Sequence, residues 1–269
     1  MRLVAVVVAV AACGRINFDP RPGCDPRAPF TSIRPLGAIN TVDGEGGLRL
    51  SDDELTGYYH SNHGVTGYGI FLATRASRDD DFPLGTFTGI GGLFPSLTPD
   101  RLTMVFDALD EIRTATRLTE ADMFVGTTPL PNINTTGGEG QAMLDATARE
   151  LYFVRTTPTE EIFVASWPDL VERRVTELDM PGSDRVPVIS ADGLTIYWSR
   201  FVIGTSEIWM ARRTSIELPF GRAMKVEELD TPLDDAATWV SSDLCRLYIE
   251  SDRDSAGSNY DLYVAERVP

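Results

Sequence analysis

A short segment recurs five times along this chain of 269 residues, and the repetition constrains the fold more than any single motif. Each copy is a turn followed by a run of aliphatic and aromatic residues. The turns start at residues 53, 100, 147, 192 and 243, so successive copies are 47, 47, 45 and 51 residues apart. A period of about 40 to 50 residues built from short strands is typical of a solenoid, an array or a propeller.

Each copy contains more than one strand. The run after each turn has the composition of a strand with at least one buried face. A second column follows in every copy, with an aliphatic residue first and Ala last, at residues 70–73, 112–115, 162–165, 208–211 and 262–265. Another apolar strand precedes each turn and ends at Leu50, Leu97, Leu144, Ile189 or Val240.

A fourth element lies between copies and shows how the two ends of the chain are related. This element contains a Phe and a Thr with the same spacing in three segments, which are Phe30 and Thr41, Phe124 and Thr135, and Phe220 and Thr231. Residues 29–41 have no preceding copy, while the last copy stops after its third strand. We therefore predict an all-β fold, a five-bladed propeller of four-stranded blades in one domain at residues 29–269. The N-terminal strand would join the last blade and remove open sheet edges.

An open β-solenoid or a pair of β-sandwiches is the alternative architecture, but neither explains why one repeat is divided between the two ends of the chain. Residues 190–198 read S-A-D-G-L-T-I-Y-W, and residues 251–253 and 260–264 add S-D-R and Y-D-L-Y-V. These segments resemble the TolB-type, WD40-like propeller repeat over roughly residues 29–269. The resemblance implies the fold and says little about activity, because propellers host many unrelated functions.

The first residues have the pattern of an export signal. Arg2 is followed by an almost wholly apolar run at residues 3–12, which is too short to span a bilayer as a helix. Val-Ala-Ala before Cys13 resembles the bacterial lipobox, which implies removal of residues 1–12, lipidation of Cys13 and a tether at residues 13–28. Gly14 favours the outer membrane of the cell envelope. An ordinary secretory signal or a buried strand is the alternative.

Two other cysteines are predicted to pair. Cys24 precedes the closing strand, and Cys245 lies in the blade that this strand should complete. An exported protein can hold disulfides, so we expect a Cys24–Cys245 disulfide that locks the closure. Two free thiols are the alternative.

Composition and charge exclude some partners. The net charge is −16, which opposes binding to nucleic acid or to anionic membrane surfaces. Lys225 is the only Lys, and we attribute this preference for Arg to the coding sequence rather than to a binding site.

No catalytic or cofactor-binding constellation is evident, and no metal site is predicted. His60 and His63 are the only histidines, and no G-x-S-x-G motif occurs. Residues 252–257 resemble a calcium loop only weakly, since the carboxylate at the twelfth position is missing. The recurrent carboxylates are expected to hold turns, and they are Asp52, Asp53, Asp100, Asp192 and Asp243.

Tryptophan offers the remaining candidates for recognition. Trp198 and Trp209 belong to blade-core columns, while Trp167 and Trp239 lie outside them and are freer to serve on a surface. We expect a monomeric, non-catalytic, lipid-anchored envelope propeller that binds another envelope protein or a glycan through its loops. The alternative is a five-bladed glycoside hydrolase-like enzyme that uses channel carboxylates.

Overall fold

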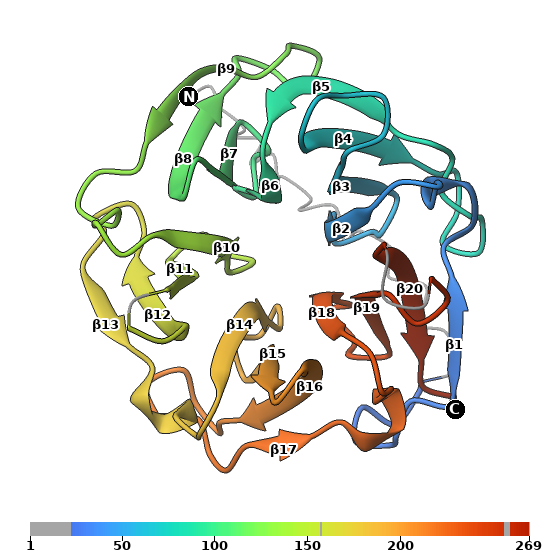
Figure 1. Cartoon of the computed structure of the whole chain (residues 1–269), viewed down its shortest axis with the longest axis vertical. Coiled ribbons are helices and arrows are strands. Elements are labelled where there is room, and N and C mark those ends of the chain that lie inside the picture. Colours follow the sequence, from blue (N-terminus) through green and yellow to red (C-terminus); the bar gives the residue numbers. More distant parts are fainter. Residues whose placement is uncertain (1–22, 157, 256–258, 269) are drawn as a thin grey trace, which may run out of the picture.

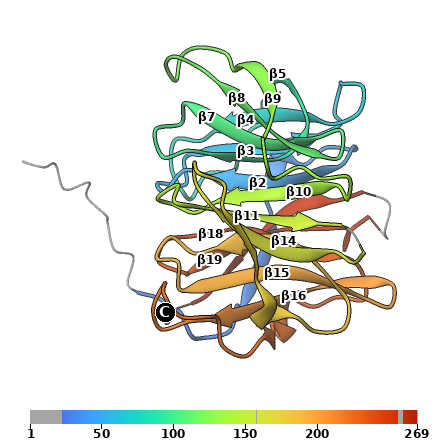
Figure 2. The same cartoon turned by 90° about the vertical axis from the view of Figure 1, so that its left-hand side faces the viewer.

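The computed structural model describes residues 23–156, 158–255 and 259–268 of the chain. Five four-stranded antiparallel sheets stand around a central axis (Figure 1). Figure 2 views the same ring from the side. The described part contains no α-helix and only three short 3₁₀ turns, at Gly37–Ile39, Thr176–Leu178 and Glu227–Leu229. The predicted five-bladed propeller is thus confirmed.

The blades are numbered from the first complete one, and blade 5 is divided between the two ends of the chain. Blade 1 is β2 (Glu45–Leu50), β3 (Thr56–Ser61), β4 (Gly69–Thr74) and β5 (Thr86–Gly91). Blade 2 is β6 (Leu93–Leu97), β7 (Thr103–Ala108), β8 (Glu111–Thr116) and β9 (Val125–Pro129). Blade 3 is β10 (Glu139–Leu144), β11 (Glu150–Arg155), β12 (Glu161–Ser166) and β13 (Glu172–Arg174). Blade 4 is β14 (Ser183–Ile189), β15 (Thr195–Val202), β16 (Thr205–Arg212) and β17 (Met224–Lys225). Blade 5 is β18 (Asp235–Val240), β19 (Arg246–Ser251), β20 (Asp261–Glu266) and β1 (Ser32–Pro35).

The N-terminal strand closes the ring as predicted. β1 pairs antiparallel with β20, with Ser32 opposite Glu266 and Pro35 opposite Tyr263. The structure also has the predicted disulfide between Cys24 and Cys245, whose Cα atoms are 5.9 Å apart. Phe30 is buried in the core just before β1. The end of the ring is therefore held by strand pairing, a covalent bond and apolar packing.

The hydrophobic core lies between neighbouring blades rather than inside any one of them. Each second strand is covered on both faces, and all six residues of β19 are buried. Such strands read as continuous apolar runs instead of alternating ones. This burial explains why aromatic and aliphatic residues bunch after every turn in the sequence.

Four of the five predicted turn carboxylates hold the turns between first and second strands, as expected, whereas Asp52 lines the cavity of the central channel. Asp53 accepts hydrogen bonds from the Leu55 N–H at 3.0 Å and from the Ser51 hydroxyl at 2.5 Å. The same arrangement recurs at Asp100, Asp192 and Asp243. In blade 3 the role passes to Asp145, which accepts from the backbone N–H groups of Arg149 and Glu150.

Arginine has a structural role that the sequence interpretation missed. Where the third strand ends, a buried Arg stacks on a Phe of the following segment at 3.7 to 4.5 Å from the ring centre, in the pairs Arg75–Phe82, Arg117–Phe124, Arg213–Phe220 and Arg267–Phe30. Each guanidinium also donates to backbone carbonyls nearby, as Arg213 Nε does to Gly193 at 2.7 Å. The preference for Arg therefore also reflects a repeated packing arrangement. A planar guanidinium can stack on an aromatic ring and donate hydrogen bonds in its own plane at the same time.

Candidate functional site

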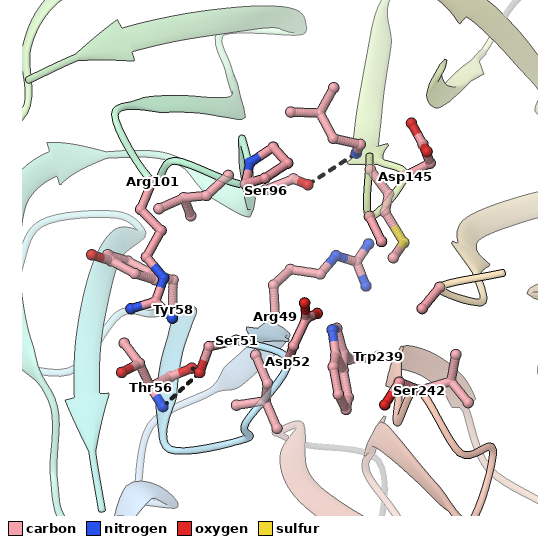
Figure 3. A pocket seen from close by; sticks show the side chains of 18 of the residues that line it. Arg49, Ser51, Asp52, Thr56, Tyr58, Ser96, Arg101, Asp145, Trp239 and Ser242 are labelled. Carbon is pink, nitrogen blue, oxygen red and sulfur yellow. Dashed lines mark hydrogen bonds between the residues drawn. The ribbon is translucent and has the colours of Figure 1, made fainter. Parts of the chain in front are cut away.

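The inner strands form a cup at the end of the central channel that carries the turns between first and second strands. Its floor is a ring of residues at equivalent register positions, Arg49, Ser96, Met143 and Trp239, with Val188 completing the ring in blade 4. Its walls are Leu50, Leu97, Leu144, Ile189 and Val240, and its rim is Asp52, Pro99, Ala146, Ala191 and Ser242. The cavity measures about 400 Å³ (Figure 3).

Arg49 is the only charged member of the floor ring. The residue is 5% exposed, and its Nε, Nη1 and Nη2 atoms are buried without a hydrogen-bond partner among the described residues. Figure 3 shows the side chain extending from β2 into the space between Ser96 and Trp239. Burial lowers the pKa of Arg49 to about 10, against the opposing charges of Glu250 and Asp107. The guanidinium is therefore still protonated at neutral pH.

Deeper in the channel, the side chain at the fifth position of the second strand accepts a backbone N–H from the next blade. This contact occurs in blades 1, 2 and 5. His60 Nδ1 accepts the Phe94 N–H at 3.2 Å, and Glu250 Oε2 accepts the Gly47 N–H at 2.6 Å. Asp107 Oδ2 accepts the Gln141 N–H in the same way. The three donors lie at bulges of the inner strands and have φ values of 46°, 59° and 56° for Phe94, Gly47 and Gln141. We call His60, Asp107 and Glu250 the clasp residues.

Burial changes the pKa of every clasp residue. It raises the pKa of Asp107 and of Glu250 to about 7, although the backbone donors and the charge of Arg49 oppose the shift. It lowers the pKa of His60 to about 3, with Arg49 as a second cause, so this imidazole is neutral at physiological pH. Near pH 7 both carboxyls are partly ionised, and their combined negative charge opposes that of Arg49 without contacting its nitrogens.

A second, more open hollow of about 570 Å³ lies where blades 2 and 3 meet and is lined by Asp107, Leu109, Gly137 and their neighbours. Asp107 Oδ1 is buried and has no hydrogen-bond partner among the described residues. Its lining combines three glycines, at residues 137, 138 and 140, with polar side chains that include Asp107, Glu139 and Gln141.

The other predicted residues have varied outcomes. The two histidines lie apart, since His60 is a clasp residue while His63 Nδ1 contacts Asp43 Oδ2 at 2.8 Å. No group of three or more potential metal ligands gathers anywhere in the described ranges. Trp198 is fully buried and Trp239 lines the cup, whereas Trp167 packs against a core cluster.

Some predictions fall outside the described residues. Cys13, the signal at residues 1–12 and part of the segment that weakly resembles a calcium loop are among them. No helix in the described part of the chain is both long and apolar enough to cross a bilayer.

Comparisons with known proteins agree with the fold. No protein-family model and no curated protein matches the chain. Among solved structures it is similar to TolB from Acinetobacter baumannii, with a TM-score of 0.51, 15% identity, and 85% of this chain and 56% of that chain covered. It is equally similar to the α-L-arabinofuranosidase PaAbf62A from Podospora anserina, with a TM-score of 0.52, 14% identity, and coverages of 88% and 96%. Likeness at these identities establishes the fold alone.

Sequence interpretation did not identify Arg49 or the clasp residues. The sequence does contain a signal for Arg49. It is a charged residue just before the last apolar residue of a first strand, at a position where the other copies have Ser, Met, Val and Trp. The signal for the clasps was an ionisable residue in the fifth position of a buried second strand.

Proposed function

We propose that this protein is a non-catalytic recognition propeller of the bacterial cell envelope, anchored through a lipid on Cys13, that binds another envelope component at the cup. The observation that carries the proposal is the make-up of the cup, with an unpaired guanidinium on the floor and apolar walls. A concave, mostly apolar pocket with one well-placed polar group is the usual form of a binding site. The partner is an envelope protein or a glycan, and an outer-membrane location is part of the proposal.

Crosslinking from the rim tests the recognition role. A photoreactive amino acid replaces the exposed Ala146 at the rim, and a matched variant carries it at the exposed Met224 of β17. We expect a discrete adduct in intact cells from position 146 and none from position 224. Equal labelling at both positions, or no adduct above background, would contradict the proposal.

The anchor is tested separately. The mature N-terminus should have the mass of a lipidated Cys13, and Cys13→Ala should release the protein from membrane fractions. A Cys13→Ala variant that still sediments with membranes would contradict the lipid anchor and leave the crosslinking result unaffected.

A glycoside-active enzyme is the second candidate, because a carboxyl with a pKa of about 7 is suited to general acid catalysis and both Asp107 and Glu250 have one. Their position weighs against it: both accept backbone N–H groups across blades, His60 does the same in blade 1, and neither carboxyl lines the cup. Hydrolysis of 4-nitrophenyl glycosides that Asp107→Asn or Glu250→Gln abolishes would favour the enzyme.

A further inference from the structure

The buried guanidinium of Arg49 needs a negative partner that the described protein does not provide by direct contact. Leaving a buried charge without hydrogen bonds is costly, and native structures keep such groups rarely. Asp107 and Glu250 act on Arg49 through their charge, but their carboxylates accept backbone N–H groups at the blade junctions. Arg49 is therefore a fixed positive charge whose hydrogen-bonding capacity is unused.

The surroundings of Arg49 restrict the kind of anion that fits. The walls nearest the guanidinium are mainly aliphatic, with the indole of Trp239, which is 8% exposed. The same cavity is also lined by charged side chains of both signs, which are Asp52, Asp53, Asp145, Arg78 and Arg101. The two clasp carboxyls behind the single cation repel additional negative charge, so the site favours a singly charged anion over a doubly charged group such as phosphate. The walls favour a compact apolar or aromatic body.

We propose that the cup binds a monocarboxylate, with the carboxylate on Arg49 and an apolar body against the leucine-rich wall and Trp239. A guanidinium presents parallel donors that match both oxygens of a carboxylate. The cavity of about 400 Å³ is the size of a small-molecule site. This ligand class deepens the proposed recognition function, on which it rests, and it does not depend on the lipid anchor.

Access to the guanidinium requires a small rearrangement at the floor, because the three nitrogens are covered. Met143 holds the equivalent ring position in blade 3 and lines the same cavity. Its unbranched thioether side chain adapts to new neighbours at low cost. We therefore expect the ligand to bind with a change in the packing of Met143 rather than of the backbone.

Calorimetric titration of the purified protein tests the site with indole-3-acetate as the probe and the uncharged indole-3-acetamide as its matched control. We expect saturable binding of the acetate, at least tenfold weaker binding of the amide, and at least tenfold weaker acetate binding in Arg49→Met and Arg49→Gln. Ala146→Trp changes only the exposed rim and narrows the mouth, so it should weaken binding even if both Arg49 variants fail to fold.

A second pair of probes distinguishes the source of the carboxylate. A short apolar peptide with a free C-terminal carboxylate is compared with the same peptide amidated. Tighter binding of the free-ended peptide than of indole-3-acetate assigns the site to chain ends, and the reverse assigns it to small organic acids. If neither acid shows binding that depends on Arg49, the inference is overturned. If an acid binds but position 146 gives no crosslink in cells, the monocarboxylate site stands and the proposed recognition of an envelope component is contradicted.

Discussion

At the scale of single residues, a site for an anion carries a cost in stability. Removal of the unpaired buried charge in Arg49→Met leaves an apolar side chain of similar length in an otherwise uncharged ring. We expect the free energy of unfolding to rise by about 1 to 3 kcal/mol, as when buried ionic groups are replaced by apolar ones. Urea denaturation measures this change.

The matched control is Arg101→Met, whose side chain lies at the rim and pairs with the exposed Glu120. A surface change of this kind should stay within about 0.5 kcal/mol of the wild type. If Arg49→Met lowered the free energy of unfolding by more than 1 kcal/mol, Arg49 would stabilise the fold and would not be held in place for a ligand.

The clasp carboxyls give the protein an unusual pH dependence. The folded state holds the pKa of Glu250 at about 7, above the ordinary 4.5, so it binds the proton more tightly than the unfolded chain. The stabilisation is fully present below pH 4.5 and is lost as the pH rises through 7. Glu250→Gln keeps a neutral acceptor for the Gly47 N–H and should lack this loss.

Denaturation of both proteins between pH 4.5 and pH 8 checks the prediction. The wild type should lose about 3 kcal/mol relative to Glu250→Gln over this interval, at 1.36 kcal/mol for each pKa unit. His60 acts in the opposite direction, because its lowered pKa removes stability as the pH falls below 6.5 toward 3. Parallel pH profiles for the two proteins would show that Glu250 is ionised in the fold throughout.

At the scale of strands and turns, local patterns were readable while contacts between blades were not. The second strands were predicted because burial on both faces leaves continuous apolar runs, and the turn carboxylates because they hold their own backbone. The direction of Arg49 depends on a bulge between Gly46 and Arg49, which shifts the pairing with β3. A shift of one residue moves a side chain to the other face, so alternation in the sequence cannot place Arg49 in the channel.

The stacked arginines at the ends of the third strands are expected to be sensitive to substitution. Arg213 stacks 4.5 Å from the centre of the Phe220 ring and donates to the Gly193 carbonyl, with its side chain only 1% exposed. Arg213→Gln should cost about 2 to 4 kcal/mol, because it removes the stack and leaves the partly buried Gly193 carbonyl without its Arg donor. Arg173→Gln on the half-exposed surface of β13 is the control, and an equal effect of the two changes would refute the role of the stack.

At the scale of the whole molecule, the ring depends on joining two ends of the chain. The Cys24–Cys245 disulfide connects positions 221 residues apart. A cross-link over so long a loop should stabilise by about 5 kcal/mol on the chain-entropy model. The double variant Cys24→Ser with Cys245→Ser should lose much of this free energy of unfolding. A reductant should destabilise the wild type and leave the double variant unchanged, and a wild type indifferent to reductant would contradict the prediction.

The same disulfide determines which face of the propeller a lipid anchor would bring toward the membrane. Cys245 lies between β18 and β19, in the turn that also places Ser242 on the rim of the cup. If Cys13 carries the lipid, the eleven residues from Cys13 to Cys24 reach at most about 36 to 40 Å. The cup would then open toward the bilayer, and the turns between second and third strands would face away.

Energy transfer to labelled lipids tests this orientation in the anchored protein. Donors are attached at Ala146→Cys on the rim and, as the matched control, at Ile203→Cys, which is 97% exposed in the turn between β15 and β16 on the opposite face. We expect stronger transfer from position 146, because the short tether begins beside the rim. Equal transfer from both positions would mean that the tether does not orient the ring, and stronger transfer from position 203 would turn the cup away from the membrane. Stronger transfer from position 146 would place the cup against the bilayer. Ligands of the cup would then have to be small, or held at the membrane surface, to enter the space between the cup and the bilayer.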